Sequence, residues 1–450
     1  MAEAKSSTLN MTEGTIWKQL VFFSLPLLLG NLFQQLYSTV DSWVVGNYVG
    51  PHAFGAVTSN APAINALIGL FMGFSAGSSV VISQFFGAGD LKDLRKSTHT
   101  AVVSTFVLGV IMSLVGFLAS GWIVKAMRAA PEIAPEAVTY LRIYFAGLLF
   151  LMLYNMGCAI LRAVGDSKKP LYFLIFSSVV NTALDLLFVI RFKMGVAGVA
   201  WATVISEFLA MLLTFYILFR SDDVYSLRFN ELETDKDMLR RIVRIGLPSG
   251  FQMALTSFSN IFVQGYINGF GAASTSGWGS YNRIDAFAIL PVQSLSLATT
   301  TFSGQNAGAK RYDRIRKSEG VSLALCVGAT LLISAAIWIW APEVTRFFND
   351  SPEVIEMGSY FLRVITPFNI MFCFYMVHAG ILRGVGDAKG PMIIMLSSFV
   401  AFRQLYLLIS THITDSILPV ALAYPMGWCV CAAAMAIYYN IRKRTILKDD

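Results

Sequence analysis

The chain has 450 residues, of which 56% are hydrophobic and only 14% are charged, and its net charge is +7. A soluble domain carries about 25% charged residues, so this composition excludes an ordinary soluble enzyme and indicates a membrane protein. A positive net charge alone would be compatible with binding of nucleic acid. The basic residues, however, are confined to alternate connections between apolar segments, which is typical of membrane topology, and no nucleic-acid partner is expected.

Twelve apolar segments, each long enough to cross about 30 Å of hydrocarbon, follow one another along the chain. The first six are Trp17–Val45, Phe54–Phe86, Thr98–Val124, Ala137–Leu161, Leu171–Ile190 and Gly195–Phe219. The second six are Met238–Asn268, Trp278–Ser303, Gly320–Ala341, Gly358–Leu382, Met392–Thr411 and Ile417–Ile441. The sequence therefore predicts an all-α integral membrane protein with twelve transmembrane helices: a six-helix bundle in residues 1–220, a linker in 221–238 and a second bundle in 239–450.

Charge placement predicts the orientation of these spans. The odd-numbered connections hold few basic residues, namely Lys125, Arg128, Arg191, Lys193 and Arg346. Most Lys and Arg residues lie in the termini and in the even-numbered connections. By the positive-inside rule, both termini are expected on the cytoplasmic side of the plasma (inner) membrane.

A duplication underlies the two groups of six spans. The decapeptide LRAVGDSKKP at Leu161–Pro170 returns as LRGVGDAKGP at Leu382–Pro391, an offset of 221 residues with seven identities. The same offset carries Gln84, Gly87, Ala88, Arg95, Lys96 and Ser97 onto Gln305, Gly308, Ala309, Arg316, Lys317 and Ser318. The chain is therefore a tandem repeat. Because six spans return the chain to the same side, the repeats are parallel, related by an axis along the membrane normal.

Several motifs along this framework resemble those of a known family. They are Leu25–Pro26 with Asp41 and Gly46, Gly87–Gly89, the doubled LRxVGD, Asn181 with Asp185, Gly198–Thr203, and GQNAG at Gly304–Gly308. On these residues the chain resembles the multidrug and toxic compound extrusion (MATE) transporters, whose superfamily also holds lipid-linked oligosaccharide flippases. The resemblance implies two six-helix bundles around a cavity that opens alternately to each side. It also implies export of organic cations against inward flow of H⁺ or Na⁺.

Carboxylates inside apolar spans give the sharpest chemical signal, because a charge there is costly and usually faces a cavity or a partner. Asp41, Asp185 and Thr203 lie at similar predicted depths, about 9–15 Å below the outer charged boundary at ~1.5 Å per residue. Asn181 precedes Asp185 by one helical turn. The resemblance implies a cation site at the same four positions. The alternative is that these groups only form hydrogen bonds between helices.

The expected coupling ion is H⁺ or Na⁺. Burial favours the protonated form of a carboxyl group, whereas oxygens of Asp41 and Asp185 would also suit a hard cation such as Na⁺. No other cofactor and no further metal is expected, because the cysteines lack ligand spacing. In the second repeat Phe402 and Tyr406 replace Asn181 and Asp185, so the ion site is predicted in the first half.

Other residues are predicted to serve the ion site or a substrate cavity. They are Glu207, Arg403, His378, Phe368, Met371, Phe372 and Tyr375. Aromatic faces attract organic cations, and Met adapts to varied shapes, but each of these residues also has a purely structural interpretation. Pro26 interrupts the first span, either as a hinge or as a static kink.

The sequence thus predicts a secondary active antiporter, not an enzyme, that exports amphipathic, cationic compounds. Its expected partners are small organic cations and membrane lipid, and it is expected to be a monomer. The alternative is a lipid or lipid-linked oligosaccharide flippase, which would need a cavity lined by Arg and Lys to bind pyrophosphate. In this sequence only Arg403 is a basic residue in mid-span, which disfavours the flippase alternative.

Overall fold

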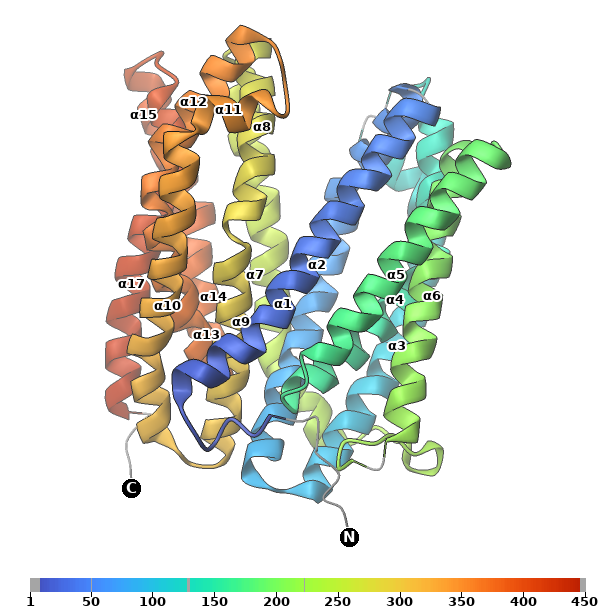
Figure 1. The fold of residues 1–450 in the computed structure, drawn as a ribbon, viewed down its shortest axis with the longest axis vertical. Helices are drawn as coiled ribbons and strands as arrows, with labels where there is room; N and C mark the ends of the chain where they lie inside the picture. The colour runs from blue at the N-terminus through green and yellow to red at the C-terminus, as the bar shows by residue number, and fades with distance from the viewer. Residues whose placement is uncertain (1–8, 50, 128–129, 222, 446–450) are drawn as a thin grey trace. The chain divides into compact units, whose positions relative to one another are not determined.

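The computed structural model of the protein describes residues 9–49, 51–127, 130–221 and 223–445, with the backbone only at 41–43, 46, 47, 51–63, 65 and 66. These residues form helices, turns and loops without a β-strand (Figure 1). Nine helical segments among them are long and apolar enough to cross a membrane. The predictions of an all-α fold and of a multi-pass membrane protein are confirmed.

The helices of the first repeat coincide with the first six predicted spans. They are α1 (Ile16–Val44) with the π-helical turn η1 (Val45–Val49), α2 (Pro51–Ala88), α3 (Leu91–Ala126), α4 (Ala134–Ala163), α5 (Lys168–Leu186) with η2 (Leu187–Arg191), and α6 (Gly195–Arg220). The connection to the second repeat contains a short 3₁₀ turn, η3 (Phe229–Glu231).

The second repeat contains more interrupted helices. They are α7 (Lys236–Asn268), α8 (Ala272–Ala288), α9 (Leu290–Gly308), α10 (Tyr312–Ile339), α11 (Ala341–Arg346), α12 (Pro352–Ile365), η4 (Thr366–Phe368), α13 (Asn369–Gly384), α14 (Lys389–Leu396), η5 (Ser397–Phe402), α15 (Arg403–Ile413), α16 (Leu418–Ala421) and α17 (Ala423–Thr445). The predicted spans Trp278–Ser303 and Gly358–Leu382 are each two helices, divided near Pro291 and Pro367. Proline cannot donate a backbone hydrogen bond, so it begins a new helix more readily than it continues one.

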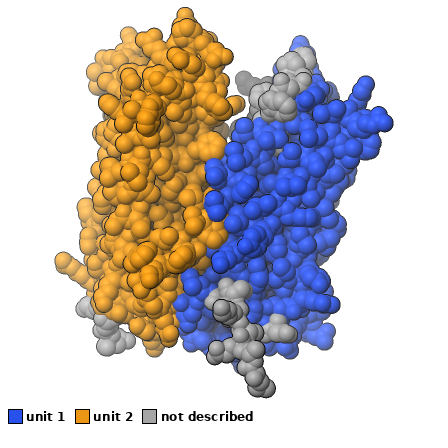
Figure 2. Space-filling view, viewed as in Figure 1, with its two compact units in different colours: residues 1–10, 29–247 blue, residues 11–28, 248–450 orange. Residues whose placement is uncertain are grey.

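By its internal contacts the chain divides into two units (Figure 2). Within the described residues, unit 1 contains residues 9, 10 and 29–247, and unit 2 contains residues 11–28 and 248–445. Helices α1 and α7 are therefore each shared: each begins in one unit and ends in the other. The changes fall close to Pro26 and at Pro248, the prolines inside these two helices.

Small residues let the helices of unit 1 approach closely. A Cβ on Gly116 of α3 would lie 2.3 Å from Phe145 of α4, and one on Gly157 of α4 would lie 2.4 Å from Thr214 of α6. Helix α7 enters this unit in the same way, because a Cβ on Gly77 would lie 2.5 Å from the Gly246 nitrogen. Close backbone approach of this kind is typical of helix pairs in membranes, and it places α4 between α3 and α6.

Unit 2 is built around aromatic packing. The ring of Trp278 in α8 contacts Phe361 of α12 and Tyr424 of α17, with centroids 5.1 and 5.5 Å apart. Helix α13 packs on α9, where a Cβ on Gly384 would lie 2.6 Å from the Thr300 carbonyl oxygen. The core of this unit therefore joins helices that are far apart in the sequence.

The doubled LRxVGD motif forms the same turn twice. Gly165 and Gly386 have φ of +89° and +93°, a conformation open to glycine at little cost. The following aspartates accept backbone hydrogen bonds at the start of the next helix: Asp166 from the Lys168 amide and Asp387 from the Gly390 amide, both at 3.1 Å. These loops belong to the end of the helices that carries most Lys and Arg, which we call the basic end.

Candidate ion and substrate site

Two polar residues of α5, Asn181 and Asp185, lie one turn apart and are 1% and 0% exposed. Neither polar atom of the Asn181 side chain has a hydrogen-bond partner in the described part of the chain. A buried polar group without a partner costs about 1–3 kcal/mol, so its presence calls for an explanation other than packing. A site that takes up a proton or a cation is one such explanation.

Helix α6 places Thr203 and Glu207 one turn apart on the wall of a cavity of about 380 Å³ inside unit 1. The Thr203 hydroxyl donates to the Val199 carbonyl at 3.1 Å, which leaves the oxygen lone pairs able to accept or to coordinate. Oε2 of Glu207 is buried and has no hydrogen-bond partner among the described residues. The Glu207 side chain therefore lines the cavity and has a buried carboxylate oxygen that no described residue satisfies.

Tyrosines complete the wall of this cavity. Tyr37 comes from α1, and Tyr140 and Tyr144 come from α4 with their ring centroids 6.2 Å apart in a stacked arrangement. The neutral polar groups on the wall are Gln34, Ser38 and Asn155. A carboxylate, aromatic faces and neutral polar groups are the features that suit an organic cation.

Sequence reasoning missed most of these wall residues, although the spacing of three of them along α1 could have revealed those three. Gln34, Tyr37 and Ser38 precede Asp41 by seven, four and three residues, which is the spacing of one helix face. Tyr140, Tyr144 and Asn155 gave no such signal, because only the packing of α4 against α6 turns them toward Glu207.

Asp41, the first predicted ion-site residue, lies near the end of α1 in unit 1. Its side chain lies outside the described part of the structure. The remaining three predicted residues fall into two sets. Thr203 lines the cavity, whereas Asn181 and Asp185 lie on α5, which packs beside α6, and are not among the residues that line it.

In unit 2, Arg403 is 2% exposed and joins three helices. Its Nη2 donates to Ser259 Oγ and to Asn260 Oδ1 of α7, both at 2.8 Å. Its guanidinium stacks over the Tyr424 ring at 4.7 Å. Nη2 and the guanidinium plane of Arg403 thus hold α15 against α7 and α17, whereas its buried Nε has no hydrogen-bond partner among the described residues.

His378 and the aromatic residues of α13 are also packed within unit 2. His378 Nε2 lies 3.3 Å from Glu319 Oε1, and Lys443 donates to Glu319 Oε2 at 2.8 Å. Tyr375 contacts Phe372 and Phe399, with centroids 5.0 and 5.4 Å apart. Phe368, Met371 and Phe372 are partly buried against the same core. The structure shows interhelical contacts for all of these predicted cavity residues.

In α8 of unit 2, Arg283 is exposed and Asp285 is half-buried. The Asp285 carboxylate interacts electrostatically with the buried Tyr281 and Tyr375 and with the half-buried Tyr424. Tyr375 and Tyr424 interact with Arg403 as well. Unit 2 therefore has a buried polar cluster of its own, built from residue types other than those of unit 1.

Two repeated helical units that span a membrane, with a charged cavity inside one of them, are features of a membrane transporter. The profile of the family described as MatE matches residues 26–187 and 248–406, one segment in each repeat. The chain therefore belongs to the MatE family of transporters, as its motifs predicted.

The relatives extend along the whole chain. It is 29% identical to "Probable multidrug resistance protein YpnP" of Bacillus subtilis (strain 168), over 98% of both chains. It is 24% identical to "Multidrug export protein MepA" of Staphylococcus aureus (strain NCTC 8325 / PS 47), over 95% of both. A solved "multidrug resistance MATE family transporter of the MOP superfamily" in an outward-facing conformation has a TM-score of 0.93 at 24% identity, with 99% of each chain covered. A MOP superfamily transporter from Pyrococcus furiosus has a TM-score of 0.94 at 24% identity, with 99% of this chain and 100% of that chain covered.

Proposed function

We propose that this protein is a secondary active antiporter that exports amphipathic organic cations in exchange for H⁺ or Na⁺. The observation that carries the proposal is the unit 1 cavity, in which Glu207, whose buried Oε2 has no hydrogen-bond partner among the described residues, shares the wall with three tyrosines. A cavity of about 380 Å³ is within the range of small-molecule sites, roughly 300–1,000 Å³. The multidrug names of two relatives support the same class of substrate.

The coupling ion is assigned to Asp41, Asn181, Asp185 and Thr203. Asp185 is fully buried, and a carboxylate inside a membrane helix is costly and typically serves a cation or proton pathway. The Thr203 oxygen, whose proton is used by Val199, and the Asn181 carbonyl oxygen can both accept a cation. Glu207, on the cavity wall, is assigned to the organic substrate.

Helix α1 is proposed to link binding of the coupling ion to binding of the organic substrate. It carries cavity residues Gln34, Tyr37 and Ser38 as well as Asp41, and Pro26 lies nearer its basic end. Proline leaves the carbonyl of Phe22 without its helical donor, which makes this point the natural hinge of the helix. Binding of an ion near Asp41 would then alter the cavity by bending α1.

The flippase alternative is disfavoured by Arg403. A pyrophosphate group requires guanidinium or ammonium donors that it can reach, but Arg403 is only 2% exposed, its Nη2 is bound to Ser259 and Asn260, and its guanidinium stacks on Tyr424. We place the protein in the plasma (inner) membrane as a monomer with both termini on the cytoplasmic side, because the basic end of the helices should face the cytoplasm.

Transport of a fluorescent organic cation by the protein in lipid vesicles tests this function. Proton and sodium gradients are imposed separately, and Glu207→Gln is compared with Glu353→Gln, a change at an exposed glutamate. Glu207→Gln should weaken binding of the cation about tenfold or more, equal to ~1.4 kcal/mol, while Glu353→Gln should have no effect. Vesicles in which neither gradient drives transport of any cation would refute the function.

A further inference from the structure

The GQNAG motif of the second repeat has a structural role in unit 2. Its side chains bind the short segment that precedes α1, residues Met11–Thr15, which we call the strap. Gln305 Oε1 accepts the Met11 amide proton at 2.9 Å, and Asn306 Nδ2 donates to the Met11 carbonyl at 3.0 Å. Met11 itself is fully buried. The motif therefore recognises the backbone of a segment almost 300 residues away in the sequence.

Arg314, in the first turn of α10, completes this binding site. Its Nη1 donates to the Gly14 carbonyl at 2.9 Å, and its Nη2 reaches the carbonyls of Met11 and Glu13 at 3.2 and 3.3 Å. Nη2 also donates to Gln19 Oε1 at 3.0 Å in the first turns of α1. A fork of fixed N–H groups suits such a set of carbonyls, and lysine cannot reproduce it.

The guanidinium is itself held in place. Its Nε donates to Asn306 Oδ1 at 3.1 Å, and its plane lies over the Phe302 ring at 5.5 Å. Arg314 is only 9% exposed, and each of its three nitrogens has an acceptor. The site is thus organised for the strap and is not a loose surface contact.

This anchor has a consequence for α1. Residues 11–28 belong to unit 2, whereas residues 29–44, with Asp41 and the cavity residues Gln34, Tyr37 and Ser38, belong to unit 1. One end of the helix is fixed by Arg314, and the other end forms part of the candidate ion site. A helix moves as a rod between its breaks, so displacement of one end must bend it at Pro26 or pull on the anchor.

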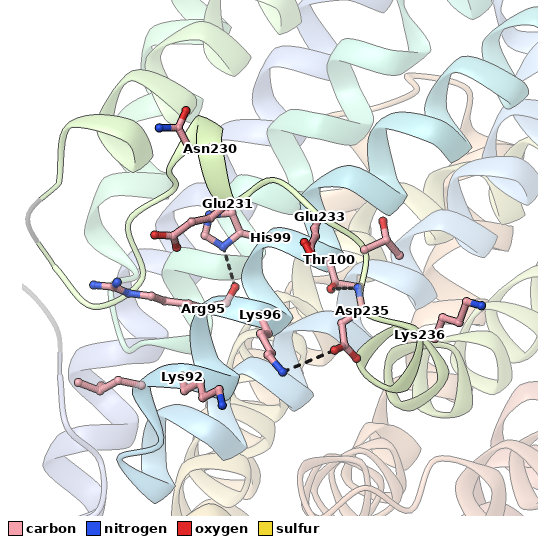
Figure 3. A pocket seen from close by; sticks show the side chains of 12 residues that line it. Lys92, Arg95, Lys96, His99, Thr100, Asn230, Glu231, Glu233, Asp235 and Lys236 are labelled. Atoms are coloured by element: carbon pink, nitrogen blue, oxygen red, sulfur yellow. Dashed lines mark hydrogen bonds and ion pairs between the residues drawn. The ribbon is translucent and has the colours of Figure 1, made fainter.

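Helix α7 is anchored in the corresponding way in unit 1. Figure 3 shows the connection before α7 lying against α3, where the Asp235 amide donates to Thr100 Oγ1 at 3.0 Å and Lys96 pairs with Asp235 at 3.7 Å. The Arg228 amide donates to His99 Nε2 at 3.1 Å. Asp235 also caps α7 by accepting from the Met238 amide at 3.0 Å. Both shared helices thus begin at a docked segment, although the residues that dock them differ.

We propose that Gln305, Asn306 and Arg314 form an anchor through which α1 transmits the state of the first-half ion site to unit 2, and that Arg314 is a positioning residue for transport. The proposal rests on the proposed antiport. Without the anchor, α1 would still respond to the ion at its far end, but unit 2 would not follow. Ion movement would then be uncoupled from export of the organic cation.

The test compares Arg314→Lys with Arg311→Lys, the same change at an exposed arginine three residues earlier. Hydrogen exchange should show that Arg314→Lys increases exchange in the strap several-fold, because the carbonyls of Met11, Glu13 and Gly14 lose the guanidinium that binds them together. In lipid vesicles its gradient-driven efflux should fall fivefold or more, while equilibrium binding of the cation changes less than twofold. Arg311→Lys should match the wild type in all three measurements.

A second variant protects the test against misfolding. Met11→Pro removes the amide that Gln305 accepts but changes no helix of unit 2, and it should have the same effects as Arg314→Lys. A strap released in either variant, with wild-type efflux, would overturn the anchor proposal. A merely structural anchor would lower binding and efflux together, which also contradicts it.

Hydrogen exchange separates failure of this proposal from failure of the proposed function. A change of pH or of Na⁺ should alter exchange both in residues 29–44 and in α10 of the wild type, but only in residues 29–44 of Arg314→Lys. This readout needs no transported substrate. If the wild type shows no response in α10, α1 does not transmit the ion signal. If the response is as expected but no cation is exported, only the function is wrong.

Discussion

The two buried acids of unit 1 differ in their surroundings. Asp185 is fully enclosed on α5, whereas Glu207 lies on the wall of a cavity large enough for an organic molecule. A charge in the apolar part of a membrane helix needs a compensating proton, cation or partner. The surroundings of an enclosed acid admit no ligand larger than a small ion, whereas an acid on a cavity wall is also accessible to a bulky cation. This difference is the physical basis for assigning coupling to Asp185 and substrate binding to Glu207.

Asp41 belongs with Asp185 in this scheme. The change Asp41→Asn keeps the size of the side chain but removes its ability to bind a proton or to balance a cation. We expect gradient-driven efflux to fall more than about tenfold, equal to ~1.4 kcal/mol, with normal amounts of protein in the membrane. Efflux from vesicles that contain equal amounts of wild type and variant measures this. Normal efflux by Asp41→Asn would remove Asp41 from the ion site.

His378 was predicted as a possible cavity residue, but its contacts indicate a structural role. It lies between Glu319 of α10 and the ring of Tyr439 in α17, whose centroid is 4.7 Å from its own. His378→Leu should lower the stability of the folded protein by about 1–3 kcal/mol, because Glu319 loses a buried partner. Thermal unfolding in detergent measures this loss.

The conservative change provides the control for His378. His378→Gln keeps a nitrogen donor for Glu319 and should restore part of the lost stability. Neither variant should change which ion drives efflux. A variant of normal stability with an altered ion dependence would instead place His378 in the transport pathway.

The sequence predicted the polar side chains inside the apolar spans, but it did not predict the site that binds the strap. Asn181, Asp185, Thr203 and Glu207 were found from the sequence because each is a polar group inside an apolar run. The strap site was not found in this way. Gln305, Asn306 and Arg314 bind backbone carbonyls and an amide of residues 11–14, and because every residue has these backbone groups, the sequence does not show which of them are bound. The GQNAG motif was visible, but its ligand was not.

At the scale of helices, glycines determine which pairs approach closely. Gly157→Ala would place a methyl group 2.4 Å from Cγ2 of Thr214 across the α4–α6 contact. We expect a loss of about 1–3 kcal/mol in stability from this overpacking. Thr214→Ser removes that methyl group but keeps the hydroxyl that donates to the Ala210 carbonyl at 2.8 Å. The double variant should therefore recover most of the stability in thermal unfolding.

The control for this pair is Gly328→Ala in α10. Nothing lies within 4 Å of a Cβ at Gly328, so alanine should be neutral there or should stabilise the helix by about 0.5–1 kcal/mol. If Gly157→Ala lowered the thermal stability no more than Gly328→Ala does, α4 and α6 would not approach as closely as the structure shows.

Helix positions were predictable from hydropathy, and helix breaks were only partly so. The repeat and its apolar runs located the helices, nine of which are long and apolar enough to span among the described residues, because each run must bury its length in hydrocarbon. Pro291 and Pro367 divide two of these spans, whereas Pro26 and Pro248 lie inside continuous helices. The same residue type thus ends one helix and is tolerated in another, since neighbouring helices decide whether the freed carbonyl can be satisfied.

At the scale of the whole molecule, duplication has preserved the scaffold and allowed the chemistry of the two units to diverge. Phe402 and Tyr406 take the places of Asn181 and Asp185 at the repeat offset, and their rings are stacked with centroids 6.4 Å apart. Unit 2 instead places the buried Arg403 and the half-buried Asp285 among tyrosines. The repeat correctly predicted the helices and loops that both halves have in common. The sequence did not show that α1 begins in unit 2 and α7 begins in unit 1. This assignment depends on contacts such as that of Gly77 with Gly246.

This asymmetry bears on the coupling ion, for which we predict H⁺. A hard cation needs about six oxygen ligands, and unit 1 offers the oxygens of Asp185, Asn181 and Thr203 on two neighbouring helices, with Asp41 on a third. A proton needs only a single carboxyl group, so either Asp41 or Asp185 alone provides enough ligands for it. The counterparts of Asn181 and Asp185 in unit 2 cannot add the missing ligands.

The measurement is efflux from vesicles that carry a sodium gradient, with the pH clamped equal on both sides. If H⁺ is the coupling ion, efflux under this condition should be near the background rate and should recover when a pH gradient is imposed without Na⁺. Competition of Na⁺ for the same carboxylates would appear as slower proton-driven efflux at high Na⁺, relieved at lower pH, because protons then displace the metal ion. Full-rate efflux on the sodium gradient, lost when potassium replaces sodium, would show that Na⁺ is the coupling ion instead.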